Sequence, residues 1–412
     1  MNKRFRPVVA FLILTIAIMA CALPLGEGGD PSTPDQVATA VALTMQALTP
    51  VGDGGTTPTS VPVETRLLPH TLYFVNNDGA GMAQIFRMER DGETTQPVTA
   101  EPGGVGNYDV SPIDGSVAYV ANNQLLLINA DGSGRRMLAD GGAIDPNNPF
   151  ATSLSSPVFS PDGQTIAYSY RGLVLYNLST GASNIVLQEI GPDPITGTDA
   201  PLRMFFPQTY SPDGTRLLIT IAIPYSDGFS ANIYNIASTA LTPLTGGDGA
   251  RLCCGQQAWT ADGSALYVGS STVGMFGSGL WRVDANTGST TALIPGEAGG
   301  GAYNLIAYPY PAPDGNLYFF YNTALNPEGI IDRPPLQIVR TFIDGVSGRS
   351  ILRPENFSLL NEALWAPDAS FVLTATAPIQ DVREGGILEL YYTDGRPVIQ
   401  LLDFASDLKW GP

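Results

Sequence analysis

A four-residue turn recurs along the chain and constrains its fold more than any other feature. Ser160-Pro161-Asp162-Gly163 stands between two short apolar runs. Proline presets the first turn angle, aspartate binds its own backbone, and glycine takes the positive φ that a tight hairpin requires. Related turns repeat at roughly 50 residues, a period typical of propellers and solenoids. They are Ser111-Pro112-Ile113-Asp114-Gly115, Ser211-Pro212-Asp213-Gly214, Thr260-Ala261-Asp262-Gly263, Ala312-Pro313-Asp314-Gly315 and Ala366-Pro367-Asp368-Ala369.

Most repeats contain four predicted strands. In the unit around Ser160 we expect strands over 157–160, 165–169, 173–177 and 183–187. Four antiparallel strands per repeat are typical of a β-propeller blade. A closing turn between the last two strands recurs as Ser179-Thr180-Gly181, Ala130-Asp131-Gly132, Asn286-Thr287-Gly288 and Thr393-Asp394-Gly395.

The two ends of the repeat array complete each other. The first unit lacks an innermost strand, since its predicted strands are 71–75, 83–88 and 96–99. At the other end of the chain, residues 407–412 match residues 362–367, which are expected to form an innermost strand and lead into a turn. We therefore predict an all-β fold, a seven-bladed β-propeller of four-stranded antiparallel blades, in which the C-terminal strand pairs into the first blade and closes the ring. Six or eight blades are the alternatives if the divergent unit over 303–353 is counted differently.

The motif allows a resemblance to be stated. A typical repeat consists of an apolar strand, the Ser-Pro-Asp-Gly turn, a strand such as that with Ala167-Tyr168, and a strand such as that ending at Asn177 before Thr-Gly. This pattern resembles the WD-like repeats of the TolB family and of the propellers in prolyl oligopeptidase-type peptidases. The resemblance covers residues 71–412. It implies a propeller that serves binding, scaffolding or enzyme gating. The Asp-Gly pairs are structural turn residues and are assigned no ligand, and Asp368-Ala369 departs from the pattern, which predicts a looser turn.

The N-terminus has the pattern of an export signal. Residues 1–20 begin with basic residues and continue into an apolar run, and Ile18-Met19-Ala20-Cys21 resembles the lipobox of bacterial lipoproteins. We expect Cys21 to carry a lipid that anchors the protein to the outer face of a bacterial membrane, in the cell envelope; an uncleaved anchor is the alternative. Residues 21–66, rich in Pro, Thr and Gly, are predicted to be a flexible tether, and residues 67–412 the propeller.

The charge of the chain restricts its partners. The formal net charge is −18, and removal of residues 1–20, which contain Lys3, Arg4 and Arg6 and no acid, makes it −21. Such a chain repels nucleic acid, so no nucleic-acid partner is expected.

Candidate binding residues are expected in the long loops opposite the short turns, because binding residues concentrate in long loops on a rigid scaffold. These loops cover residues 139–155, 188–206, 222–230, 269–279, 321–336 and 377–386. Aromatic, arginine and carboxylate side chains of this kind recognise peptides, carboxylates or sugars. The candidates are Phe150, Arg203, Phe205, Tyr225, Arg251, Phe276, Glu328, Asp332, Arg333, Asp381, Arg383 and Glu384.

The residues needed for common catalytic sites are sparse. His70 is the sole histidine, so a Ser-His-Asp triad or a multi-histidine metal site has no material, and no Gly-x-Ser-x-Gly elbow occurs. No catalytic residue, metal or cofactor is assigned. Adjacent Cys253 and Cys254 are a possible vicinal disulfide. The sequence favours a non-catalytic module that binds an envelope protein, peptide or polysaccharide. A carboxylate-based glycan hydrolase or lyase, using Glu328 with Asp332 or Asp381 with Glu384, is the alternative.

Overall fold

The computed structural model describes residues 66–412 except 147–148, 190–202, 224–228, 245–251, 253–254, 272–277 and 326–332. The chain divides into two units, Met1–Val63 and Glu64–Pro412, and all described residues belong to the second. These residues form antiparallel β-sheets with one short helix, α3 (Pro149–Thr152). Within the described part no helix is long and apolar enough to cross a membrane.

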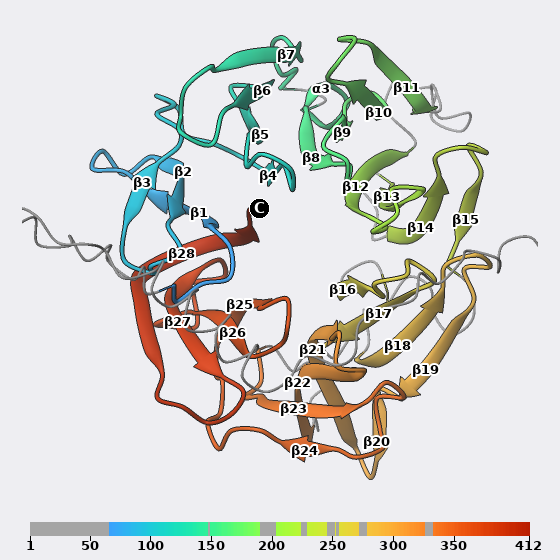
Figure 1. Cartoon of the computed structure of the whole chain (residues 1–412). Helices are drawn as coiled ribbons and strands as arrows, with labels where there is room; N and C mark the ends of the chain where they lie inside the picture. The colour runs from blue at the N-terminus through green and yellow to red at the C-terminus, as the bar shows by residue number, and fades with distance from the viewer. Residues whose placement is uncertain are drawn as a thin grey trace, which may run out of the picture. The chain divides into compact units, whose positions relative to one another are not determined.

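Four of the sheets have four strands in simple antiparallel order, and they follow one another around a common centre (Figure 1). The expected strands 83–88 and 165–169 coincide with β2 and β9, which confirms the strand pattern. The sheets are β4 (Tyr108–Val110), β5 (Val117–Ala121), β6 (Gln124–Ile128) and β7 (Arg136–Asp140); β8 (Ser155–Phe159), β9 (Thr165–Ser169), β10 (Gly172–Asn177) and β11 (Ser183–Gln188); β12 (Met204–Tyr210), β13 (Arg216–Ala222), β14 (Phe229–Asn235) and β15 (Leu241–Pro243); β16 (Gln256–Trp259), β17 (Ala265–Ser270), β18 (Gly279–Asp284) and β19 (Thr290–Ile294).

Two further sheets are larger. A five-stranded sheet adds a short strand to the divergent unit, and a seven-stranded sheet contains strands from both ends of the repeat array. In chain order they are β20 (Glu297–Gly299), β21 (Ala302–Pro311), β22 (Asn316–Leu325), β23 (Gln337–Phe342) and β24 (Ser350–Ile351); and β25 (Leu360–Trp365), β26 (Phe371–Thr376), β27 (Gly386–Tyr392), β28 (Ile399–Trp410), β1 (Leu72–Asn77), β2 (Ala83–Met88) and β3 (Thr95–Pro97).

Strand β28 belongs to both halves of the seven-stranded sheet. Its first part pairs with β27, where Leu390 lies opposite Ile399, and its last part pairs with β1, where Leu72 lies opposite Trp410. In Figure 1 this strand runs from the periphery of the sheets to the centre. The terminal strand expected over 407–412 is therefore the continuation of the preceding strand.

The turns form as their sequence predicts. Gly163 has a φ of 67°, its N–H donates to the Ser160 carbonyl over 2.8 Å, and the Ser160 hydroxyl donates to Asp162 Oδ1. The expectation of a looser turn at Ala369 is wrong. Ala369 has a φ of 58° and closes the same 2.8 Å hydrogen bond, to the Ala366 carbonyl, because alanine can take the left-handed conformation at a modest energetic cost.

Hydrophobic clusters lie between successive sheets and fix their order. Leu218 and Ile233 of the β12–β15 sheet pack with Leu266 and Val283 of the β16–β19 sheet. Corresponding clusters join the other successive sheets, and one joins β1 and β2 to β26 and β27 within the seven-stranded sheet. Because each sheet packs face to face with its neighbours, its first strand is held toward the centre.

Candidate functional site

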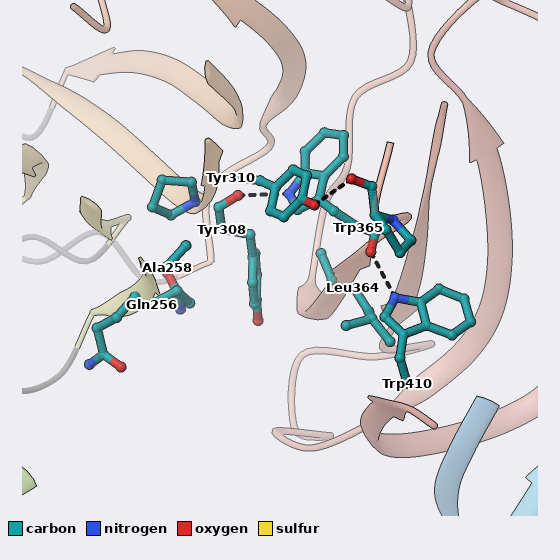
Figure 2. A pocket seen from close by; sticks show the side chains of 11 residues that line it. Gln256, Ala258, Tyr308, Tyr310, Leu364, Trp365 and Trp410 are labelled. Atoms are coloured by element: carbon teal, nitrogen blue, oxygen red, sulfur yellow. Dashed lines mark hydrogen bonds between the residues drawn. The ribbon is translucent and has the colours of Figure 1, made fainter. Parts of the chain in front are cut away.

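A cavity of about 270 Å³ lies among β16, β21, β25 and the end of β28. Figure 2 shows Tyr308 and Tyr310 from β21, Trp365 from β25 and Trp410 from β28 around it, with Gln256 from β16 on the opposite side. Most of its exposed wall is carbon. The cavity therefore offers aromatic surfaces at the place where the first strands run into the short turns.

The repeat itself supplies two of the aromatic side chains of the cavity, Trp365 and Trp410. The residue before each turn is aromatic in several units, as at Tyr210, Trp259 and Trp365, and Trp410 occupies the same place at the end of β28. A bulge modifies β21: its register against β22 shifts between Ala307 and Tyr310, and Tyr308 has a φ of 50°. As a result, β21 contributes two aromatic side chains to the cavity.

Hydrogen bonds hold the aromatic rings in position. The Trp365 indole N–H donates to the Tyr308 carbonyl over 2.8 Å, and the Trp410 indole N–H donates to the Trp365 carbonyl over 2.8 Å. The Tyr310 hydroxyl donates to the Pro367 carbonyl over 2.7 Å (Figure 2). The rings of Tyr310 and Trp365 are nearly parallel, with centroids 6.2 Å apart. Because these polar atoms already have partners, the rings present their apolar faces and edges to a ligand.

One polar atom of the cavity is unpartnered. Gln256 Oε1 is buried and accepts no hydrogen bond from the residues that the structure describes. A buried carbonyl oxygen without a donor is unfavourable by about 1 to 3 kcal/mol. The oxygen has almost no exposed surface, and Figure 2 shows the amide end directed away from the aromatic rings, so a ligand would reach it only after the Gln256 side chain turns.

Partly buried charges lie beside the cavity on the innermost strands. The Glu362 carboxylate accepts the N–H groups of Asp407 (2.9 Å) and Leu408 (3.0 Å). Burial raises the pKa of Glu362, and these two N–H groups act in the opposite direction. Because both carboxylate oxygens already bind backbone, this residue is suited to fixing β28 rather than to proton transfer with a ligand.

Lys409 completes this charged group. Its ammonium lies 3.5 Å from Asp109 Oδ1 and 3.7 Å from Asp407 Oδ1. Burial lowers the pKa of Lys409, but Asp407 and Asp109 outweigh burial and leave it raised. Burial raises the pKa of Asp109. The group therefore holds a cation between two carboxylates near the centre of the sheets.

Many of the loop residues predicted from sequence lie outside the described residues: Cys21, Tyr225, Arg251, Cys253, Cys254, Phe276, Glu328 and Asp332. Phe150 lies in α3, Arg203 is exposed just before β12, and Asp381, Arg383 and Glu384 are exposed before β27. The placement of Phe205 in a loop is wrong. It lies in β12 and is 4% exposed, because that strand begins earlier than the turn residues indicate and buries the ring between sheets.

Arg333 is a predicted binding residue whose guanidinium is bound within the structure. It donates to the carbonyl oxygens of Gln380 and Val382 and, over 2.8 Å, to Asn361 Oδ1. These donors hold the segment before β27 against the five-stranded sheet. None of the predicted residues lines the aromatic cavity, although the recurring aromatic residue before the turns is a signal for it. Among described residues, no three His, Cys, Asp or Glu side chains gather as a metal site would require.

No protein-family model matches the chain, and no curated protein is similar to it in sequence. Among solved structures, TolB from Acinetobacter baumannii is 18% identical with a TM-score of 0.41, and the match covers 83% of this chain and 65% of TolB. An oligogalacturonate lyase in complex with manganese is 11% identical with a TM-score of 0.51, over 80% of this chain and 83% of the lyase. Prolyl oligopeptidase B from Galerina marginata is 13% identical with a TM-score of 0.52, over 84% of this chain and 51% of the peptidase.

These similarities concern the fold. The lyase and the peptidase share an all-β architecture of this kind with the chain, which spans about half of the peptidase.

Proposed function

We propose that this protein is a non-catalytic binding or scaffold protein of the cell envelope. Its fold is a seven-bladed propeller closed by β28 against β1, and a lipid on Cys21 with the tether over 21–66 holds it at the outer face of a bacterial membrane. The partner is a protein, a peptide or a polysaccharide. The lipobox pattern and the scarcity of catalytic residue types in the sequence support this proposal.

The observation that carries the binding function is the aromatic cavity. The rigid rings of Tyr310 and Trp365 form a stacking surface, and the Gln256 side chain places a polar amide in the cavity wall. This combination suits a ring-bearing group, either a sugar or the aromatic side chain of a peptide, because both use an apolar face together with a few hydrogen bonds. The exposed residues Arg203, Asp381 and Arg383 on the long-loop face are proposed as further contacts with the partner.

The test is a cross-linking pull-down from envelope extract with residues 67–412. One variant, Tyr310→Ala with Gln256→Ala, alters the cavity, and a second, Arg203→Ala with Arg383→Ala, alters the loops. Loss of the partner with the first variant, at an unchanged melting temperature, supports the cavity as the site. Loss with the second supports the long-loop face. Capture of no protein, peptide or glycan by the unmodified domain contradicts the proposal.

A carboxylate-based glycan hydrolase or lyase is the alternative function, because Asp381 and Glu384 are exposed close together in sequence before β27. It requires activity on cell-wall or extracellular polysaccharide that disappears with Asp381→Ala or Glu328→Ala. Activity that survives both substitutions removes this alternative.

A further inference from the structure

A second cavity lies between two successive turns and shares no wall residue with the aromatic cavity. It has a volume of about 460 Å³ and lies between the turn at Ser160–Gly163 and the turn at Ser211–Gly214. The two turns are close neighbours, because a Cβ atom added to Gly214 would lie 3.5 Å from Pro161 Cδ. Pro161, Leu175 and Ile236 give this cavity an apolar wall.

The cavity contains a buried hydroxyl without a partner. Tyr210 lines it and is 7% exposed, and its hydroxyl forms no hydrogen bond with any described residue. The Tyr234 hydroxyl on β14 of the same sheet is likewise buried without a partner among the described residues, whereas in other sheets the Tyr119 hydroxyl donates to Glu101 and the Tyr267 hydroxyl donates to the Ile343 carbonyl. The Tyr210 oxygen has almost no exposed surface of its own. Because leaving such a group unpaired is unfavourable, a ligand in the cavity is expected to supply the partner once a small movement of the Tyr210 side chain uncovers the oxygen.

Two carboxylates give the cavity a negative wall. Asp162 Oδ1 accepts the Ser160 hydroxyl and the Gln164 N–H, and these bonds lower the pKa of Asp162. Asp162 Oδ2 has no hydrogen bond from the described residues. Asp213 stands in the same place in the next turn and its pKa is lowered in the same way. Both groups are therefore ionised near neutral pH, and a cation is the complementary ligand.

The repeat supplies an internal template for that cation. At the next pair of turns, the Arg216 guanidinium lies 3.4 Å from the Gly263 carbonyl and 4.0 Å from Asp213 Oδ2, and it also donates to Asn286. Arg216 closes its turn through a hydrogen bond from the Ser211 N–H to its carbonyl. Thr165 occupies the corresponding position, because its carbonyl accepts the Ser160 N–H over 2.8 Å. The short Thr165 side chain leaves open the space that an arginine fills one unit later.

We propose that this cavity binds the guanidinium group of an arginine side chain from a partner protein. Asp162 and the Gly214 carbonyl take the roles that Asp213 and the Gly263 carbonyl have toward Arg216. The Tyr210 hydroxyl accepts one further N–H, and the aliphatic part of the arginine packs on Pro161, Leu175 and Ile236. The net charge of −18 favours the approach of a basic partner.

The experiment measures binding of a capped arginine amide to the full chain in detergent by calorimetry. Capped citrulline amide, which has the same shape without the charge, is the ligand control. A Kd of about 1 mM is expected for so small a ligand. Asp162→Asn should weaken binding about tenfold, since a charge-assisted hydrogen bond is lost. Asp262→Asn changes the equivalent residue of a turn outside the cavity and should leave the Kd unchanged.

Thr165→Arg is the second variant, because it places an arginine in the cavity from within the chain. We expect it to abolish binding while the melting temperature stays equal or rises. Equal binding of arginine and citrulline, absence of binding, or a Kd that neither Asp162→Asn nor Thr165→Arg alters would overturn the proposal. Butylguanidine has the guanidinium, the stem and the same single charge without a peptide backbone. Weaker binding of butylguanidine supports a partner side chain, and equal or tighter binding assigns the site to a free guanidinium compound and overturns the partner.

Discussion

Trp410 donates its indole N–H to the main-chain oxygen of Trp365 over 2.8 Å, across 45 residues of sequence. The two residues stand in equivalent positions, each at the end of an innermost strand. The bond therefore connects the end of β28, which pairs with β1, to the first strand of the preceding unit.

Deletion of residues 407–412 is expected to lower the melting temperature by about 10 °C or more, because β1 loses its partner and the hydrophobic cluster around Trp410 opens. Trp410→Phe keeps a ring and removes one hydrogen bond, so a fall of a few degrees, from about 1 kcal/mol, is expected. Thermal unfolding followed by circular dichroism measures both. An unchanged melt after the deletion would contradict closure by β28.

The stability of the folded chain should depend on pH through Glu362. Burial raises the pKa of this carboxyl above its ordinary value of 4.5, so the folded chain holds the proton more tightly than the unfolded chain. Its contribution to stability is therefore present below pH 4.5 and is lost as the pH rises through the folded pKa. Relative to the unmodified protein, Glu362→Gln should become progressively more stable as the pH rises through this range.

Glu355 provides a control of opposite sign for that measurement. Its hydrogen bond with Arg353 lowers the pKa of Glu355, so its contribution is present above pH 4.5 and is lost as the pH falls through the folded pKa. Glu355→Gln should therefore lose its destabilising effect in acid. Melting temperatures of both variants across the acid range decide the matter, and parallel curves for the two would contradict the assignment to Glu362.

Two glycines test the packing of adjacent sheets. Gly315 and Gly288 both have positive φ, 79° and 69°. A Cβ atom at Gly315 meets open space, whereas one at Gly288 would lie 2.4 Å from the Pro243 carbonyl of the neighbouring sheet. Gly315→Ala should cost about 1 kcal/mol of unfolding free energy, and Gly288→Ala about 2 kcal/mol or more. Equal values in denaturant titrations would show that the two sheets do not meet at Gly288.

Arg333→Ala is expected to release the segment before β27, because the guanidinium binds the carbonyl groups of Gln380 and Val382. Amide hydrogen exchange over residues 379–385 should become faster, while exchange in β26 stays the same. Arg203→Ala, at an exposed position before β12, is the matched control and should leave that segment unaffected. If Arg333→Ala leaves exchange over residues 379–385 as slow as Arg203→Ala does, these hydrogen bonds do not support the segment.

The sequence predicts the local features of this fold well and the candidate site poorly. Turns such as Ser160–Gly163 depend on residues next to one another, so the strands around them could be located. The aromatic cavity depends on the bulge at Tyr308 and on hydrogen bonds from Trp365 and Trp410 to strands about 50 residues away, which no local pattern records. The same limitation explains Phe205, which was assigned to a loop although it packs between sheets.

The pairing of β1 with β28 has a consequence for synthesis and export. Val75 accepts a hydrogen bond from Ser406, 331 residues later, so β1 has an unpaired edge until nearly the whole chain is available. Contacts between such distant residues slow folding, and an open strand edge invites pairing with other chains. A chain that is released from its N-terminus therefore exposes this edge until its last strand arrives, and an exposed edge favours aggregation.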